Sequence, residues 1–113
     1  MMTAQKLPEP PYYAVIFVNQ RSKEDAEGYG ITAERMVELA QKEEGYLGIE
    51  SVRDDSGKGI TVSYWQSLDS IQQWKNNVEH IQARKQGKDK WYNDYQLQIA
   101  KVEHGYRWIK NER

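Results

Sequence analysis

The sequence predicts a single α+β domain in which two helices cover one face of a four-stranded antiparallel sheet. Three observations lead to this fold class. The chain has 113 residues, which is enough for one domain with a small core. Its apolar residues alternate in some stretches and recur at helical spacing in others. The resulting order of strand, helix, strand, strand, helix, strand is the split βαβ or ferredoxin-like pattern, with both helices on one face.

The chain begins with a proline-rich segment and a predicted strand. Pro8, Pro10 and Pro11 disfavour regular structure, so residues 1–11 are expected to form an extended or disordered lead-in. Residues 12–18 are β-branched or aromatic at nearly every position, which is typical of a strand that is covered on both faces. The predicted domain therefore starts at residue 12, and it is expected to run to residue 108 with a tail at 109–113.

A polar break is followed by a predicted amphipathic helix. Ser22 is a candidate N-cap of this helix, because its hydroxyl can accept a backbone hydrogen bond. The helix is expected to run to about Glu44, because Gly45 is a good helix stop. Five residues recur at helical spacing on one face: Tyr29, Ala33, Met36, Val37 and Ala40.

A predicted β-hairpin follows. Residues 46–53 form one strand and residues 60–65 the other, and residues 54–59 carry the Asp and Gly that suit a tight turn. Side chains of a strand alternate between its faces. Tyr64 and Trp65 are therefore expected on opposite faces, one toward the helices and one toward a second subunit.

The second helix is predicted from Ser67, a fair N-cap, to Gly87. Its apolar stripe is expected to consist of Ile71, Trp74, Val78 and Ile81. Residues 88–94 are expected to form a connector to the last strand.

The last strand changes its apolar parity. Tyr95, Leu97 and Ile99 alternate, and a second series begins at Val102 on the opposite parity and continues through His104, Tyr106 and Trp108. Such a switch predicts a β-bulge or bend between Ile99 and Val102. A long last strand that bends away from its own sheet is well placed to meet a second subunit, so we expect a homodimer.

Composition excludes several classes of function. The net charge of −1 with mixed signs does not indicate a nucleic-acid partner. The absence of Cys excludes disulfides and thiolate sites, and no His or carboxylate cluster has metal spacing, so no protein-bound metal is expected. No apolar run reaches the roughly 20 residues that span a bilayer, and the N-terminus has no signal sequence, so a cytoplasmic protein without a membrane partner is expected.

The aromatic composition favours a partly solvated pocket or a subunit interface. The chain has eight Tyr and four Trp but only one Phe. Tyr and Trp combine an apolar body with a polar group, which suits pocket walls and subunit contacts.

Motifs in the middle of the chain resemble the antibiotic biosynthesis monooxygenase (ABM) domain family. The likeness covers roughly residues 12–106, and it rests on the order and spacing of residues 45–53, residues 59–67, Trp74, His80, Arg84, Gly87, Trp91, Tyr92 and Tyr95. The resemblance implies a dimeric α+β barrel with a pocket between helices and sheet in each subunit. Understood members include cofactor-independent oxygenases of phenolic or quinol polyketides and heme-degrading monooxygenases.

The resemblance also suggests site residues. Trp74 matches the pocket Trp of the heme-degrading branch, although it suits a core position equally well. Asn19 lies where that branch has a functional Asn, but it also suits a strand-to-helix turn. The branch's heme-ligating His lies ten residues after its Trp, where this chain has Arg84 instead.

His80 is only six residues after Trp74. On a continuous helix of about 100° per residue it would lie about 120° away from that side chain, unless the helix breaks at Asn76–Asn77. A neutral His remains a plausible proton acceptor for a phenol, and a guanidinium four residues later suits a phenolate. The expected catalytic residues are His80, Asn19 and Arg84, and the expected substrate contacts are Trp74, Tyr64, Trp65 and Asn77.

Three functions fit these patterns. The first is a cofactor-independent monooxygenase that deprotonates a small aromatic molecule of the phenol or quinol type, which then reacts with dioxygen. The second is a heme-binding and heme-degrading monooxygenase. The third is a non-catalytic dimer that binds a small metabolite, because a fold does not determine a function.

Overall fold

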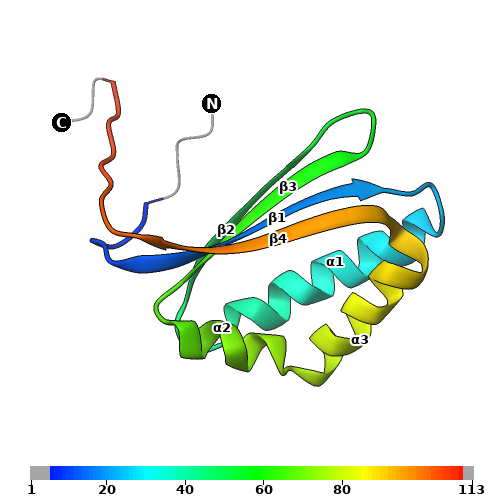
Figure 1. The fold of residues 1–113 in the computed structure, drawn as a ribbon, viewed down its shortest axis with the longest axis horizontal. Helices are drawn as coiled ribbons and strands as arrows, with labels where there is room; N and C mark the ends of the chain where they lie inside the picture. Colours follow the sequence, from blue (N-terminus) through cyan, green and yellow to red (C-terminus); the bar gives the residue numbers. More distant parts are fainter. Residues whose placement is uncertain (1–5, 111–113) are drawn as a thin grey trace.

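The computed structural model describes residues 6–110 and has the α+β architecture that the sequence predicts. Its elements are β1 (Tyr12–Arg21), α1 (Ala26–Gln41), β2 (Tyr46–Arg53), β3 (Lys58–Trp65), α2 (Leu68–Lys75), α3 (Val78–Gln86), a π-helical turn η1 (Gly87–Trp91) and β4 (Tyr92–Val102). The strands form one antiparallel sheet in the order β2-β3-β1-β4. Figure 1 shows the three helices together on one face of this sheet. None of the helices within residues 6–110 has the length and apolarity to cross a membrane.

Strand register separates the side chains into two faces. Tyr13 pairs with Trp65 and Asn19 with Gly59, so these residues share one side of the sheet. Trp65 is fully buried there in a core with Ala40 of α1 and Ile71 of α2. This side therefore faces the helices, and Tyr64 lies on the other side.

Helix α1 is shorter than the sequence predicts. It begins at Ala26, because Asp25 is the N-cap and its carboxylate accepts a hydrogen bond from the backbone N–H of Gly28. The prediction of Ser22 as the cap is wrong: its hydroxyl donates to the carbonyl of Lys90, 2.5 Å away. The helix also ends at Gln41 rather than near Glu44.

The predicted second helix is divided in two. Its N-cap at Ser67 is confirmed, since the hydroxyl accepts from the N–H of Ser70 at 3.1 Å. However, α2 ends at Lys75 and α3 begins at Val78, with the Asn77 side chain capping the second helix. The predicted apolar stripe is therefore wrong beyond Trp74, because the break turns later residues to new directions. Val78 is 69% exposed and Ile81 is 45% exposed.

Strand β4 contains no break where the sequence predicts one. Its pairing with β1 runs without a shift from Val102 to Asp94, and the only irregularity in this ladder lies at Gln20/Arg21. The bulge predicted between Ile99 and Val102 is therefore wrong. The parity changes because the strand ends at Val102, and the aromatic residues beyond it are exposed. The predicted lead-in and tail fall partly on residues 1–5 and 111–113, which lie outside the described residues.

Candidate functional site

Two groups of side chains that could take part in binding or catalysis lie on the helix-facing side of the sheet. We call the first the aromatic stack, which consists of Trp65, Trp74 and His80. We call the second the arginine cluster, which consists of Asn19, Arg21, Tyr29 and Arg53. Each group joins residues that lie far apart in the sequence.

The break between α2 and α3 brings His80 onto Trp74. The two rings are stacked, with centroids 4.2 Å apart and an angle of 13° between their planes. Asn77 holds this arrangement, because its side-chain oxygen accepts from the backbone N–H of His80 at 3.2 Å. The amide nitrogen of Asn77 also lies 3.5 Å from the carboxylate of Glu43. Asn77 thus acts on His80 through the backbone, at the junction of the two helices.

The structure defines the protonation of His80. Its Nδ1 lies 2.9 Å from the carbonyl oxygen of Trp74. Because a carbonyl can only accept, Nδ1 carries a hydrogen and Nε2 of the neutral ring keeps its lone pair. Burial lowers the pKa of His80 below its usual 6.5, and the positive charge of Arg84 also lowers it, while the bond to Trp74 opposes the shift. His80 is therefore a neutral base at pH 7.

Arg84 lies at the surface rather than between the sheet and the helices. Its Nη2 donates to the carbonyl of Lys75 at 3.1 Å, so it satisfies a free carbonyl at the C-terminal end of α2. It reaches His80 through its charge, with no hydrogen bond between the two side chains among the described residues.

Asn19 is the most deeply buried polar residue of the arginine cluster. It is 2% exposed, and its side-chain oxygen accepts from Nη1 of Arg53 at 2.8 Å. Its amide nitrogen has no hydrogen-bond partner within the described part of the chain. Buried amide donors normally have a partner, so this nitrogen is an unsatisfied donor inside the cluster.

Gly59 allows Arg53 to reach Asn19 across the intervening strand β3. A Cβ atom at Gly59 would lie only 2.6 Å from the Cζ atom of Arg53, so any side chain there would displace the guanidinium group. We did not predict Arg53 as a site residue from the sequence. The register of the hairpin, which pairs Arg53 with Gly59, is the signal that could have identified it.

Tyr29 of α1 completes the arginine cluster. Its hydroxyl accepts from Nη2 of Arg53 at 2.9 Å, and the Cζ atom of Arg21 lies 3.9 Å from its ring centroid. Trp91 and Tyr92 contact the same ring edge-on. Burial raises the pKa of the Tyr92 hydroxyl far above its usual value, with Tyr29 adding to the shift, so this hydroxyl stays protonated.

Tyr64 lies on the opposite face of the sheet from both groups. Its hydroxyl donates to Glu50 at 2.9 Å, and its ring packs edge-on against Tyr12. Burial and this carboxylate raise the pKa of Tyr64 to about 12. Trp65, by contrast, belongs to the aromatic stack, where its indole N–H donates to the hydroxyl of Ser63 at 2.9 Å. The structure therefore separates these two predicted contacts.

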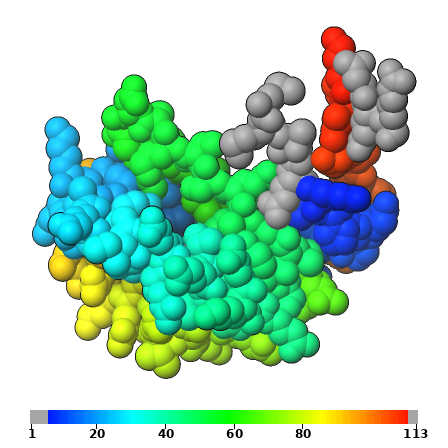
Figure 2. Space-filling model, turned by 180° about the vertical axis from the view of Figure 1, so that it is seen from behind, coloured from blue at the N-terminus to red at the C-terminus, as the bar shows by residue number. Residues whose placement is uncertain are grey.

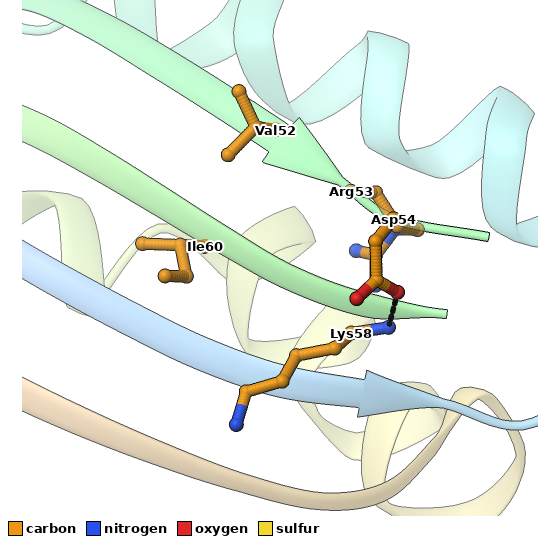
Figure 3. Close-up of a pocket in the computed structure, with 5 residues that line it drawn as sticks. All are labelled: Val52, Arg53, Asp54, Lys58 and Ile60. Carbon is orange, nitrogen blue, oxygen red and sulfur yellow. Dashed lines mark hydrogen bonds between the residues drawn. The ribbon is translucent and has the colours of Figure 1, made fainter. Parts of the chain in front are cut away.

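Surface hollows lie beside these groups. Figure 3 shows one of about 320 Å³ at the end of the β2–β3 hairpin, lined by Val52, Arg53, Asp54, Lys58 and Ile60. Figure 2 shows the same hairpin, in green, standing beside α1, in cyan. A second hollow of about 210 Å³ lies between α1 and α3, where Arg35 and Glu79 form an ion pair. The first hollow includes Arg53, but Val52 and Ile60 place it on the sheet face opposite the helices. Neither hollow is lined by His80.

Metal-binding side chains are dispersed. Over residues 6–110, no three His, Cys, Asp or Glu side chains gather closely enough to hold a metal ion.

Comparisons with known proteins agree on one family. The family model described as antibiotic biosynthesis monooxygenase matches residues 11–86. YqjZ, an uncharacterised protein of Bacillus subtilis, is 54% identical over 98 residues, which is 87% of this chain and 85% of that protein.

Solved structures share the fold. A candidate antibiotic biosynthesis monooxygenase of Nitrosomonas europaea superposes with a TM-score of 0.70 at 12% identity, over 80% of this chain and 89% of its own. Rv0793 of Mycobacterium tuberculosis superposes with a TM-score of 0.72 at 12% identity, over 84% of this chain and 99% of its own. Likeness at such low identity concerns the fold alone.

Proposed function

Because the chain belongs to the antibiotic biosynthesis monooxygenase family, we propose that it is a monooxygenase of a small aromatic molecule of the phenol or quinol type. In this reaction the substrate supplies the electrons. A ring C–H carbon of the phenol is oxidised to a quinone carbonyl: one atom of dioxygen enters the product at that carbon, and the other leaves as water. The protein supplies a base, an anion-stabilising donor and a dry site.

The observation that carries this proposal is the neutral imidazole of His80. Its Nδ1 is held by the carbonyl of Trp74, which leaves Nε2 free to accept a phenol proton. The lowered pKa of His80 keeps the ring in its basic form at pH 7. The stacked indole of Trp74 covers one face of the imidazole, and Trp74 is the proposed aromatic contact of the substrate.

Asn19 is the proposed donor to the substrate anion. Its buried side-chain nitrogen has hydrogens without a partner in the described residues, and Arg53 holds the other end of the amide. A preorganised donor in a site without bulk water stabilises a developing negative charge more strongly than water does. Arg84, which lies at the surface, contributes through its charge to keeping His80 neutral.

Replacing His80 with alanine is expected to slow oxygen uptake about 100-fold or more, since a positioned general base contributes that much. The measurement is oxygen consumption with a panel of quinols, using the wild type as reference. His104→Ala is the matched control, because His104 is exposed and lies beyond β4. Equal rates in wild type and His80→Ala would remove His80 from the mechanism.

The pH dependence gives a second measurement of the same prediction. A base whose pKa is lowered stays active at lower pH, so the rate is expected to fall only when the pH drops below 6.5. A panel compound that binds without being consumed at any pH would instead favour a metabolite-binding protein.

Heme degradation is the second candidate, and the same imidazole favours it. Histidines that ligate a metal commonly donate their other ring N–H to a carbonyl, as Nδ1 of His80 does to Trp74. His80 would hold the iron of a heme through Nε2, and the bound heme would supply the iron that activates dioxygen. Titrating the protein with hemin separates the candidates. A shifted Soret band that His80→Ala abolishes would support heme, and no shift at micromolar protein would exclude it.

We also propose that two copies of the chain form a dimer. The sheet face opposite the helices carries Ile16, Val18 and Val62, and the cross-strand pair Val52 and Ile60 is 72% and 40% exposed. Strand β4 is an edge strand; its Leu97 and Ile99 pair with Phe17 and Val15 on the helix-facing side, where each is 50% exposed. An unpaired edge beside an uncovered apolar face is a typical subunit interface. A second copy would cover both surfaces by two-fold symmetry.

A further inference from the structure

We propose that the arginine cluster binds the carboxylate of an aromatic acid that carries a hydroxyl on the adjacent ring carbon. This inference rests on the proposed function, because it specifies the class of aromatic substrate for the same helix-facing layer. Two guanidinium groups and one buried amide support it.

Positive charge in the cluster lacks a negative partner. The guanidinium carbons of Arg21 and Arg53 lie 3.9 and 5.6 Å from the centroid of the Tyr29 ring, so the two cations share one aromatic side chain. Neither forms an ion pair with a carboxylate of the described residues. Arg53 donates instead to neutral acceptors on Asn19, Gly57 and Tyr29. Two neighbouring cations without a counter-ion repel one another, and a bound anion relieves this repulsion.

Arg53 keeps donors for a ligand. A guanidinium group has five N–H donors, and the three hydrogen bonds above leave two of them, one on Nη2 and one on Nε, without a partner in the described part of the chain. A planar carboxylate matches such a pair of donors better than a point acceptor does.

Asn19 specifies the second group of the ligand. Its unpartnered nitrogen belongs to the same amide whose oxygen is 2.8 Å from Arg53. Donors on Asn19 and Arg53 are therefore close neighbours. Two oxygens on adjacent ring carbons, one of a carboxylate and one of a hydroxyl, can occupy both donors together. In this proposal Asn19 therefore donates to the ring hydroxyl oxygen of the ligand.

Salicylate and its neutral isostere salicylamide test the inference by isothermal titration calorimetry of the full chain. Salicylate is expected to bind at least about ten-fold more tightly than salicylamide, since hydrogen bonds to charged groups are worth that much. Arg53→Met is expected to abolish the difference between the two ligands. Lys42→Met removes one positive charge from the exposed end of α1 and is expected to preserve it.

Asn19→Asp provides a second variant that retains shape. Its carboxylate still accepts from Arg53 but repels an anion, so salicylate binding is expected to disappear while salicylamide binding persists. Equal affinities for the two ligands in the wild type would overturn the inference. Phosphate that binds as tightly as salicylate, with the same dependence on Arg53, would also overturn it, because the site would then recognise any anion.

The binding and oxygen-uptake experiments can contradict the acid-binding site and the proposed function independently of each other. If the wild type consumed oxygen with a quinol but bound salicylate and salicylamide equally well, this inference alone would be overturned. Selective salicylate binding without oxygen uptake from any quinol would overturn the proposed function and leave the acid-binding site in place.

Discussion

Replacing Trp65 with alanine is expected to lower the free energy of unfolding by about 3–5 kcal/mol, the usual cost of truncating a buried large aromatic residue. Trp65 is fully buried, its ring packs edge-on against Tyr46 at 5.6 Å, and it lies 6.3 Å from the stacked ring of Trp74. Its removal leaves a cavity between the sheet and α2. Because domains of this size are stable by only about 5–15 kcal/mol, much of the total would be lost.

Thermal and urea denaturation measure this effect at a fixed protein concentration, because association would make the midpoint concentration-dependent. Leu68→Ala is the matched control: Leu68 lies on α2 but is 54% exposed, so its truncation should cost little. If the two variants unfolded at the same midpoint, Trp65 would not be central to the core. Fluorescence should also change, since Trp65→Ala removes a neighbour of Trp74.

Replacing Ile16 with glutamate is expected to convert the proposed dimer into monomers. Ile16 lies at the centre of the free sheet face, where it pairs with Val62 on β3 and Gln98 on β4. Two-fold symmetry would place two such carboxylates in one interface, and burying each unpaired charge costs several kcal/mol.

Light scattering coupled to size-exclusion chromatography measures the mass of each variant. Gln73→Glu introduces the same charge on the exposed side of α2 and is expected to leave the dimer intact. A wild-type chain that elutes as a monomer would contradict the proposal of a dimer. A dimeric Ile16→Glu variant would show that another surface, such as the exposed edge of β4, forms the interface.

Most of the fold could be predicted because its signals are local. Residues 46–53 form β2 as expected, the Gly-containing turn follows them, and Ser67 caps α2 as its sequence position indicates. Errors arose where distant contacts compete with local preference. Ser22 suits an N-cap, but the neighbouring η1 turn supplies a carbonyl acceptor from Lys90 and removes it from the helix.

The sequence suggested individual candidate residues, and the structure arranges them in two groups. Trp74, His80 and Asn19 were predicted from the resemblance and from their chemistry, and the structure places all three on the helix-facing side. Their grouping depends on the helix break at Asn76–Asn77, which the sequence analysis gave only as a condition. It also depends on the contact of Arg53 with Asn19 across Gly59, which was not predicted. The helix break and the Arg53–Asn19 contact both depend on the packing of elements that are distant in the sequence.

The sequence by itself determined the α+β fold class, the hairpin, the alternation of Tyr64 and Trp65 and the family, because periodicity and motif spacing are written along the chain. Tertiary structure alone decided which face meets the helices, where the second helix breaks and which side chains are left with free donors. The amide of Asn19 shows why. Its partner Arg53 is 34 positions away, and both the bond between them and the nitrogen left unpartnered exist only after strand pairing brings them together.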